Sequence, residues 1–432
     1  MKTLRVITLG CSKNTVDTEH LLYQVRDSYE IVPEDDPRPV DVEAINTCGF
    51  IGDAKEQSIQ VILEQAARKK AGLVGRLIVF GCLSQRYMSE LPDLIPEVDG
   101  WFGARELDSL VKALGCKPSS ASYKRVLTAP GRPYAFFKIS EGCNRRCSYC
   151  AIPFIRGAHR SVPIETLVKE ARDLAAQGIR ELVIIAQDTT YYGLDIYGKR
   201  CLAQLLRELS KVDGIQWLRI HYSYPADFPE DVLDEMASNP KVCRYMDIPL
   251  QHISDGVLAA MHRGVDGAWT KALIKRMRER VPGVVLRTTM IVGHPGEGTR
   301  EFNELLQFVK DARFQRLGAF TYSEEEGTYG AENLRDSVRP STKKKRLDAL
   351  MEAQRGISLA YNQSRIGTEE KVLADSLQDG VLVCRSEFES PEVDGEILVK
   401  APSGIDAASL VGTFFNVRIT GADEYDLIAE II

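Results

Sequence analysis

The chain has 432 residues and carries 55 Lys and Arg against 61 Asp and Glu, a formal net charge of −6. With 44% hydrophobic and 27% charged residues it has the composition of a globular protein, which excludes intrinsic disorder and a collagen-like fold. Single cores seldom exceed about 300 residues, so the length predicts two or three domains. No uncharged apolar run reaches the roughly 18 residues of a membrane span, and we expect a cytoplasmic protein with no membrane partner.

The first 118 residues predict a small α/β domain. Apolar runs at 4–9, 42–47 and 77–80 are typical of buried parallel strands, and 53–70 has a helical pattern between the last two. The order is βαβαβ. A segment rich in Pro, Ser and Gly at 116–133 then predicts a linker.

Residues 129–360 predict a second domain in which strands and helices alternate. Six candidate strands lie at 134–139, 182–186, 217–222, 245–249, 284–292 and 317–322. A helix at 164–177 stops at Gly178, and a longer one at 341–365 leads out of the domain. Six such units indicate a partial (β/α)6 barrel. A closed eight-unit barrel stays open as an alternative, although it needs two units that the sequence does not show.

Residues 363–432 predict a third domain, a small antiparallel β-barrel of the oligonucleotide-binding size class. Its short strands at 371–374, 381–384, 396–399 and 414–419 are separated by turns at Asp379-Gly380 and Asp394-Gly395. This segment has five basic residues against 14 acidic ones, a charge of −9, which leaves +3 for the rest of the chain.

Ten cysteines are unusual in a cytoplasmic chain, where thiols stay reduced and favour metal binding or catalysis. Cys143, Cys147 and Cys150 follow the first barrel strand with C-x-x-x-C-x-x-C spacing. Three thiolates this close can hold three irons of a [4Fe-4S] cluster and leave the fourth iron open to a small molecule. A zinc site with His159 as the fourth ligand, or a chance group of buried cysteines, are the alternatives.

A second group of cysteines is dispersed along the chain. Cys11, Cys48 and Cys82 each follow one of the three predicted strands of the first domain. Because parallel strands bring their carboxyl ends to one edge of a sheet, the three thiols can meet there. Independent buried cysteines are the alternative. The other four, Cys116, Cys201, Cys243 and Cys384, have no such placement and are interpreted as ordinary residues.

The chain resembles the radical S-adenosylmethionine (SAM) methylthiotransferase family over essentially its whole length. Residues 10–14, 46–50 and 81–86 resemble the family's N-terminal domain, 141–157 with Tyr149 resemble its radical SAM core, and the tail resembles the TRAM barrel. The resemblance implies that the Cys143, Cys147 and Cys150 cluster binds SAM and yields a 5′-deoxyadenosyl radical. It also implies a second [4Fe-4S] cluster on Cys11, Cys48 and Cys82, and an external reductant such as flavodoxin or ferredoxin.

Four stretches resemble the branch of that family that acts on ribosomal protein S12: 185–190, 221–225, 247–252 and 390–395. The resemblance implies methylthiolation of the β-carbon of an aspartate, with SAM as both radical source and methyl donor. The acidic tail also favours a basic protein and disfavours tRNA, whose phosphates need Lys and Arg. The alternatives are a tRNA adenosine methylthiotransferase and, more remotely, a non-enzymatic iron-sulfur or zinc module that binds nucleic acid.

Candidate SAM contacts lie mostly at the predicted strand ends, where barrel enzymes bind ligands. They are Tyr149, Gln187, Asp188, Arg219, Gln251 and Gly293, and Gly293 belongs to a stretch that resembles the family's adenine-binding motif. An internal salt bridge is an equal alternative for Arg219, a plain turn for Gly293, and hydrogen bonding beside the site for the others. No side chain is assigned a role as catalytic acid or base.

Overall fold

The computed structural model describes residues 1–121, 123–401 and 406–432; Ser122 of the predicted linker lies outside them. The chain divides into two compact units. Unit 1 comprises Met1–Pro130, Ser140–Arg145 and Cys150–Arg160, and unit 2 comprises Gly131–Ile139, Arg146–Tyr149 and Ser161–Ile432. Within the described ranges, no helix combines the length and hydropathy needed to cross a membrane.

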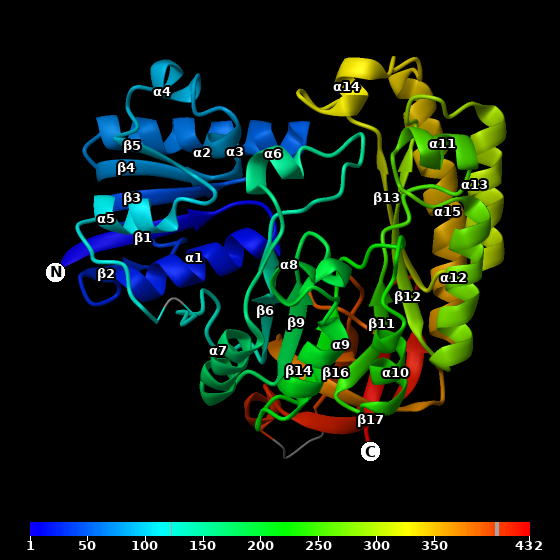
Figure 1. Ribbon diagram of the computed structural model, residues 1–432. Coiled ribbons are helices and arrows are strands. Elements are labelled where there is room, and N and C mark those ends of the chain that lie inside the picture. The colour runs from blue at the N-terminus through cyan, green and yellow to red at the C-terminus, as the bar shows by residue number, and fades with distance from the viewer. Residues whose placement is uncertain (122, 402–405) are drawn as a thin grey trace. The chain divides into compact units, whose positions relative to one another are not determined.

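Unit 1 is built on a five-stranded parallel sheet with the strand order β2-β1-β3-β4-β5 (Figure 1). The strands are β1 (Lys2–Thr8), β2 (Tyr29–Val32), β3 (Val40–Thr47), β4 (Val74–Gly81) and β5 (Gly100–Gly103). The three predicted strands are confirmed as β1, β3 and β4. The prediction missed β2 and β5, which have four residues each and lie at the edges, where a long apolar run is not required.

Helices cover both faces of this sheet. They are α1 (Ser12–Val25), α2 (Gly52–Lys70), α3 (Cys82–Arg86), α4 (Leu91–Leu94), α5 (Leu107–Ala113) and α6 (Ile152–Arg156). Leu21 of α1 and Leu110 of α5 pack in one apolar cluster with Ala44 of β3, whereas Ile62 of α2 packs in another with Ile45. Neighbouring β3 residues therefore point into opposite cores, as strand geometry requires.

Unit 2 contains a six-stranded parallel sheet with the order β13-β12-β11-β10-β9-β6. The strands are β6 (Tyr134–Lys138), β9 (Glu181–Ile185), β10 (Trp217–Ile220), β11 (Val242–Asp247), β12 (Val285–Val292) and β13 (Arg316–Thr321). All six predicted strands and the partial barrel are confirmed. In the described part of the chain the sheet is open, with β6 and β13 as its edges.

Helices follow the strands of unit 2 and cover the sheet. They are α7 (Ile164–Ala176), α8 (Leu194–Tyr197), α9 (Leu202–Ser210), α10 (Asp231–Ser238), α11 (Asp255–Ala260), α12 (Gly267–Arg280), α13 (Thr299–Ala312), α14 (Tyr329–Asn333) and α15 (Pro340–Ser364). The helices predicted at 164–177 and 341–365 are confirmed as α7 and α15. The short elements β7 (Ser140–Glu141), β8 (Arg160–Ser161), η1 (Thr189–Tyr191) and η2 (Ala407–Leu410) complete the inventory of the described residues.

The C-terminal barrel closes in the order β14-β15-β16-β18-β17. Its strands are β14 (Glu369–Gln378), β15 (Val381–Ser386), β16 (Ile397–Lys400), β17 (Phe414–Ala422) and β18 (Leu427–Ile431). The small barrel is confirmed, with one correction to its topology: β18, which the sequence analysis missed, pairs parallel to β16. The other neighbouring strands are antiparallel. Closure therefore depends on a short final strand that inserts beside a non-consecutive neighbour.

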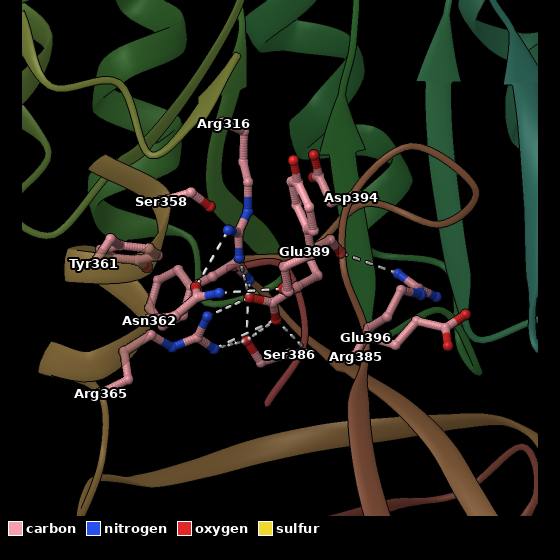
Figure 2. A network of polar contacts seen from close by, with 12 residues as sticks. Arg316, Ser358, Tyr361, Asn362, Arg365, Arg385, Ser386, Glu389, Asp394 and Glu396 are labelled. Atoms are coloured by element: carbon pink, nitrogen blue, oxygen red, sulfur yellow. Dashed lines mark hydrogen bonds and ion pairs between the residues drawn. The ribbon is translucent and has the colours of Figure 1, made fainter. Parts of the chain in front are cut away.

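A buried carboxylate joins this barrel to the six-stranded sheet (Figure 2). Glu389 is 1% exposed and accepts a hydrogen bond from Arg316 of β13 at 3.0 Å and another from Arg365. Arg365 also pairs with Glu370 at 2.6 Å. Burial alone raises the pKa of Glu389, but Arg365 and Arg316 outweigh it and hold that pKa at about 2. The carboxylate is therefore ionised at neutral pH.

We expect Glu389→Gln to lower the urea midpoint of the cluster-free chain at pH 7, because it takes the paired anion from buried Arg316 and leaves Arg365 with Glu370 alone. The folded-state pKa, about 2, lies below the ordinary value of 4.5, so ionised Glu389 stabilises the fold above pH 4.5 and loses this effect as pH falls toward 2. The shift corresponds to about 3 kcal/mol. The deficit of the variant is thus expected to shrink in acid.

Glu369 provides the matched control, because it pairs with Arg418 on the exposed surface of the same barrel. We expect Glu369→Gln to leave the urea midpoint at pH 7 nearly unchanged. Equal midpoints for the two variants, measured by circular dichroism, would contradict a stabilising role for the buried pair.

Candidate functional site

The three dispersed cysteines follow adjacent strands of unit 1. Cys11 lies after β1, Cys48 directly after β3, and Cys82 begins α3 at the end of β4. The loops are in close contact: a Cβ atom at Gly10 would lie 3.1 Å from Sγ of Cys48. A Cβ atom at Gly49 would lie 2.8 Å from backbone atoms of Leu83, the residue after Cys82. The structure therefore brings these three loops together, as the strand order predicts.

Of the three thiols at this edge of the sheet, Cys48 is half-buried and Cys82 is buried, whereas Cys11 is exposed. Burial raises the pKa of Cys48, and it raises the pKa of Cys82 to about 11. A neighbouring arginine, Arg156, acts in the opposite direction on both. Without a compensating positive charge, buried thiols stay protonated. A cationic metal group would supply that charge, and thiols on three loops in close contact are a donor set that suits iron.

Arg156 lies on α6 and is only 2% exposed. Its guanidinium donates to the carboxylates of Asp17 at 2.6 Å and Glu141 at 3.2 Å, and to Oδ1 of Asn14 at 2.5 Å. The same Asn14 oxygen accepts from Sγ of Cys82 at 3.8 Å. Sequence analysis assigned Arg156 no role, although it ends the stretch that resembles the radical SAM core.

The segment that follows Cys150 packs against the dispersed cysteine group. Ala151 and Ile155 form a buried apolar cluster with Cys82. Within the same unit, the amide of Cys143 donates to the carbonyl of Gly157 at 3.0 Å. Unit 1 therefore packs Cys82 against the segment that directly follows Cys150, although the two lie far apart in sequence.

Cys147 belongs to unit 2 and has a cationic partner there. Nη1 of Arg263 lies 3.4 Å from Sγ of Cys147, and the hydroxyl of Tyr224 lies 3.6 Å from it. Arg263 is 3% exposed, with its guanidinium 4.1 Å from the centre of the Tyr224 ring, and it donates to the carbonyl of Pro249 at 2.6 Å. Sequence analysis assigned neither residue this role, although Tyr224 belongs to the 221–225 stretch that resembles the S12 branch. The contacts with Cys147 have no local sequence signal, because both residues lie more than 70 positions away.

Tyr149 and Gly293 lie in one polar and aromatic neighbourhood of unit 2. The ring of His294 lies 6.4 Å from that of Tyr149, and its Nε2 is 3.4 Å from Oγ of Ser148. Burial lowers the pKa of His294 to about 4, so the imidazole is neutral at pH 7. The Gly293 amide donates to Glu297 at 2.8 Å, so that N–H is already engaged.

Gln251, in the loop that follows β11, has two unusual features. Its backbone is left-handed, with φ of 73°, and its side-chain Oε1 is buried with no hydrogen-bond partner among the described residues. Backbone strain and an unsatisfied buried acceptor each cost free energy, and both concentrate at ligand sites. An N–H donor of a bound molecule would satisfy this oxygen, which is how the site fits SAM.

Asp188 and Arg219 already have partners within unit 2. Oδ1 of Asp188 accepts from the amide of Thr190 at 2.9 Å and from its hydroxyl at 2.5 Å, which caps η1. Arg219 pairs with Glu181 at 2.6 Å and donates to the carbonyl of Glu387 at 2.7 Å. Gln187, between β9 and Asp188, is half-buried. The geometry of Arg219 agrees with the internal salt bridge that the sequence analysis left open.

The zinc alternative requires ligands that converge on one ion. Across residues 1–121, 123–401 and 406–432, no three His, Cys, Asp or Glu side chains are arranged to hold a single metal ion. The described side chains therefore do not form the single-ion site that the zinc alternative requires.

Comparison with known proteins agrees with the fold. Three family models match: the radical SAM superfamily over residues 137–309, the TRAM domain over 366–432, and uncharacterized protein family UPF0004 over 3–103. A relative from Porphyromonas gingivalis named ribosomal protein uS12 methylthiotransferase RimO is 50% identical over 431 residues, 99% of this chain and 98% of that protein. The chain belongs to this methylthiotransferase family. It is a radical SAM enzyme that transfers a sulfur-containing group and uses iron-sulfur chemistry and SAM.

Relatives with the same name and solved structures extend the comparison. The protein from Bacteroides fragilis is 47% identical, covering 100% of this chain and 99% of its own. The fold resembles TsrM from Kitasatospora setae, a radical SAM methyltransferase, with a TM-score of 0.55 and 16% identity over 96% of this chain and 85% of that one. It also resembles the cobalamin-dependent enzyme OxsB, with a TM-score of 0.55 and 13% identity over 82% and 56%. At such identities the likeness shows the fold alone.

We expect Gly49→Ala to reduce the iron that the full chain retains after anaerobic reconstitution. The added Cβ would meet backbone of Cys82 and Leu83 at 2.8–2.9 Å and push the Cys48 loop away from them. Gly52→Ala is the matched control three residues away, because a Cβ atom there has no neighbour within 4 Å. Iron analysis with equal values for both variants would show that this close approach is not needed.

Proposed function

We propose that this enzyme methylthiolates the β-carbon of an aspartate in ribosomal protein S12, using two [4Fe-4S] clusters and SAM as both radical source and methyl donor. The observation that carries the proposal is the packing of Cys82 with Ala151 and Ile155. Insertion of sulfur at an unactivated C–H bond needs a radical source and a sulfur source that act on the same carbon. A chain that packs Cys82 against the segment directly after Cys150 supports this pairing.

In this proposal Cys143, Cys147 and Cys150 hold the cluster that binds SAM, and Cys11, Cys48 and Cys82 hold the second cluster. When bound, the first supplies a 5′-deoxyadenosyl radical for hydrogen abstraction and the second supplies an open iron for sulfur. Arg263 orients the Cys147 sulfur through its 3.4 Å contact. No acid or base from a side chain is required, because the hydrogen is removed as an atom.

The proposed SAM contacts are those whose geometry leaves capacity for a ligand. Gln251 offers its buried Oε1, and Tyr149 and Gly293 lie beside the neutral His294. Gln187 and Asp188 close β9 in the same sheet and stay as candidates. We leave Arg219 out, because its guanidinium is used by Glu181 and by backbone carbonyls of Glu387 and Ser386.

The proposed protein substrate rests on the printed name of the relatives and on charge. The tail carries −9, and exposed acids such as Asp379, Asp406 and Glu430 lie on the barrel. These groups attract a basic protein and repel the phosphates of tRNA. An external reductant such as flavodoxin or ferredoxin is part of the proposal, because reductive cleavage of SAM consumes an electron.

Iron analysis tests the two-cluster proposal. We expect about eight irons per chain after anaerobic reconstitution, and about four in both Cys48→Ala and Cys147→Ala, since each removes one ligand of one cluster. The two variants separate in a second assay: Cys147→Ala abolishes 5′-deoxyadenosine formation from SAM, whereas Cys48→Ala retains it. About four irons in the unmodified chain, unchanged by Cys48→Ala, would contradict the second cluster.

Mass spectrometry of a deletion strain tests the substrate. We expect the methylthio mass increment to disappear from ribosomal protein S12 and to return when the unmodified gene is restored, but not with Cys48→Ala. Nucleoside analysis of tRNA from the same cells is the control. Loss of the modification from tRNA with S12 unaffected would replace the proposed substrate by tRNA adenosine.

A further inference from the structure

Arg156 is a buried cation at the dispersed cysteine group to which the proposed function gives no task. It lies six residues after Cys150, on α6, and is 2% exposed. Burial of an unpaired guanidinium is costly, and here Asp17, Glu141 and Asn14 offset that cost through contacts of 2.5–3.2 Å. We expect such a buried network either where its charge acts on a neighbouring group or where it fixes a conformation.

The position of the Arg156 charge relative to the cysteines distinguishes between these two roles. Asn14 Oδ1 accepts from both the Arg156 guanidinium and the Cys82 sulfur, so one atom separates the cation from the thiol. The side chain of Arg156 also interacts directly with Cys82. At such separations in a poorly solvated site, a unit charge acts strongly on any change of charge at the sulfurs.

We propose that Arg156 is a positioning residue with an electrostatic role: it ties the segment after Cys150 to the dispersed cysteine group and raises the reduction potential of the cluster there. This inference rests on the proposed cluster at Cys11, Cys48 and Cys82. Reduction adds one negative charge to a cluster, and a nearby fixed cation stabilises the reduced form. Asp17, whose carboxylate lies 2.6 Å from the guanidinium, moderates this effect.

A purely structural tie makes a different prediction. If Arg156 only fastens α6 to α1, loss of Asp17 and loss of Arg156 weaken the same contact and change the site in the same direction. If its charge acts on the cluster, removal of the cation and removal of its anion shift the potential in opposite directions. The sign of the shift therefore separates the two roles.

The test uses the full chain with Cys143, Cys147 and Cys150 changed to Ala, so that only the dispersed site carries iron. We expect Arg156→Gln to shift the midpoint potential to more negative values and Asp17→Asn to shift it to more positive values, measured by redox titration with electron paramagnetic resonance. Arg156→Lys keeps the charge and is expected to restore most of the unmodified potential. Arg26→Gln removes an exposed arginine of the same unit at the C-terminal end of α1, the end far from Cys11, and is expected to have no effect.

Iron content measured on the same samples separates the possible failures. About four irons with potentials that do not move in Arg156→Gln or Asp17→Asn would overturn the electrostatic role and leave the two-cluster proposal intact. Shifts of the same sign in both variants would also overturn it. A background chain that holds no iron would overturn the two-cluster proposal together with this inference. If Arg156→Gln fails to fold, Asp17→Asn decides alone.

Discussion

The carboxyl ends of parallel strands must meet at one edge of a sheet, and the candidate chemistry of this chain depends on that constraint. Because β1, β3 and β4 are adjacent, three cysteines spaced over some 70 residues of sequence become neighbours. Each has a glycine beside it, at positions 10, 49 and 81, and the Cβ distances at Gly10 and Gly49 show why: the loops approach too closely for a side chain. The thiol group is thus a product of sheet topology and backbone contact together.

Buried arginines bind the groups that the two sheets bring together. Arg156 lies near Cys82 within unit 1, and Arg263 lies near Cys147 within unit 2. Arg316 and Arg365 both bind Glu389 at the junction with the barrel. In each case the guanidinium has several acceptors, which is the condition under which a buried charge is tolerated. Breaking one partner leaves the others unsatisfied, so the cysteine sites and the barrel are held by networks in which single substitutions have large effects.

The sequence predicted what depends on local pattern. Apolar runs located three strands of the first sheet and all six of the second, and the strand ends predicted that the loops of Cys11, Cys48 and Cys82 meet. The sequence did not reveal β18, because five residues with little alternation of apolar and polar side chains give a weak signal. It also did not reveal the parallel pairing of β18 with β16, which is a long-range property. The sequence did not reveal the roles of Arg156 and Arg263 for the same reason. Their partners, Asn14 and Cys147, lie more than 100 residues away in the sequence. The domain boundaries and ligand assignments stay predictions.

The acidic charge of the tail has a second use that composition does not reveal. Five of its carboxylates pair with arginines of residues 129–360, among them Glu387 with Arg244 and Glu392 with Arg132. The difference in net charge between the tail, at −9, and the rest of the chain, at +3, therefore arises in part from a junction inside unit 2. Opposite charges of the barrel and the residues before it neutralise each other there. What remains for a basic partner is the smaller set of exposed acids on the barrel. A substrate drawn by this set is held by fewer charges than the sequence count suggests, so its affinity is expected to be modest and to weaken as salt is raised.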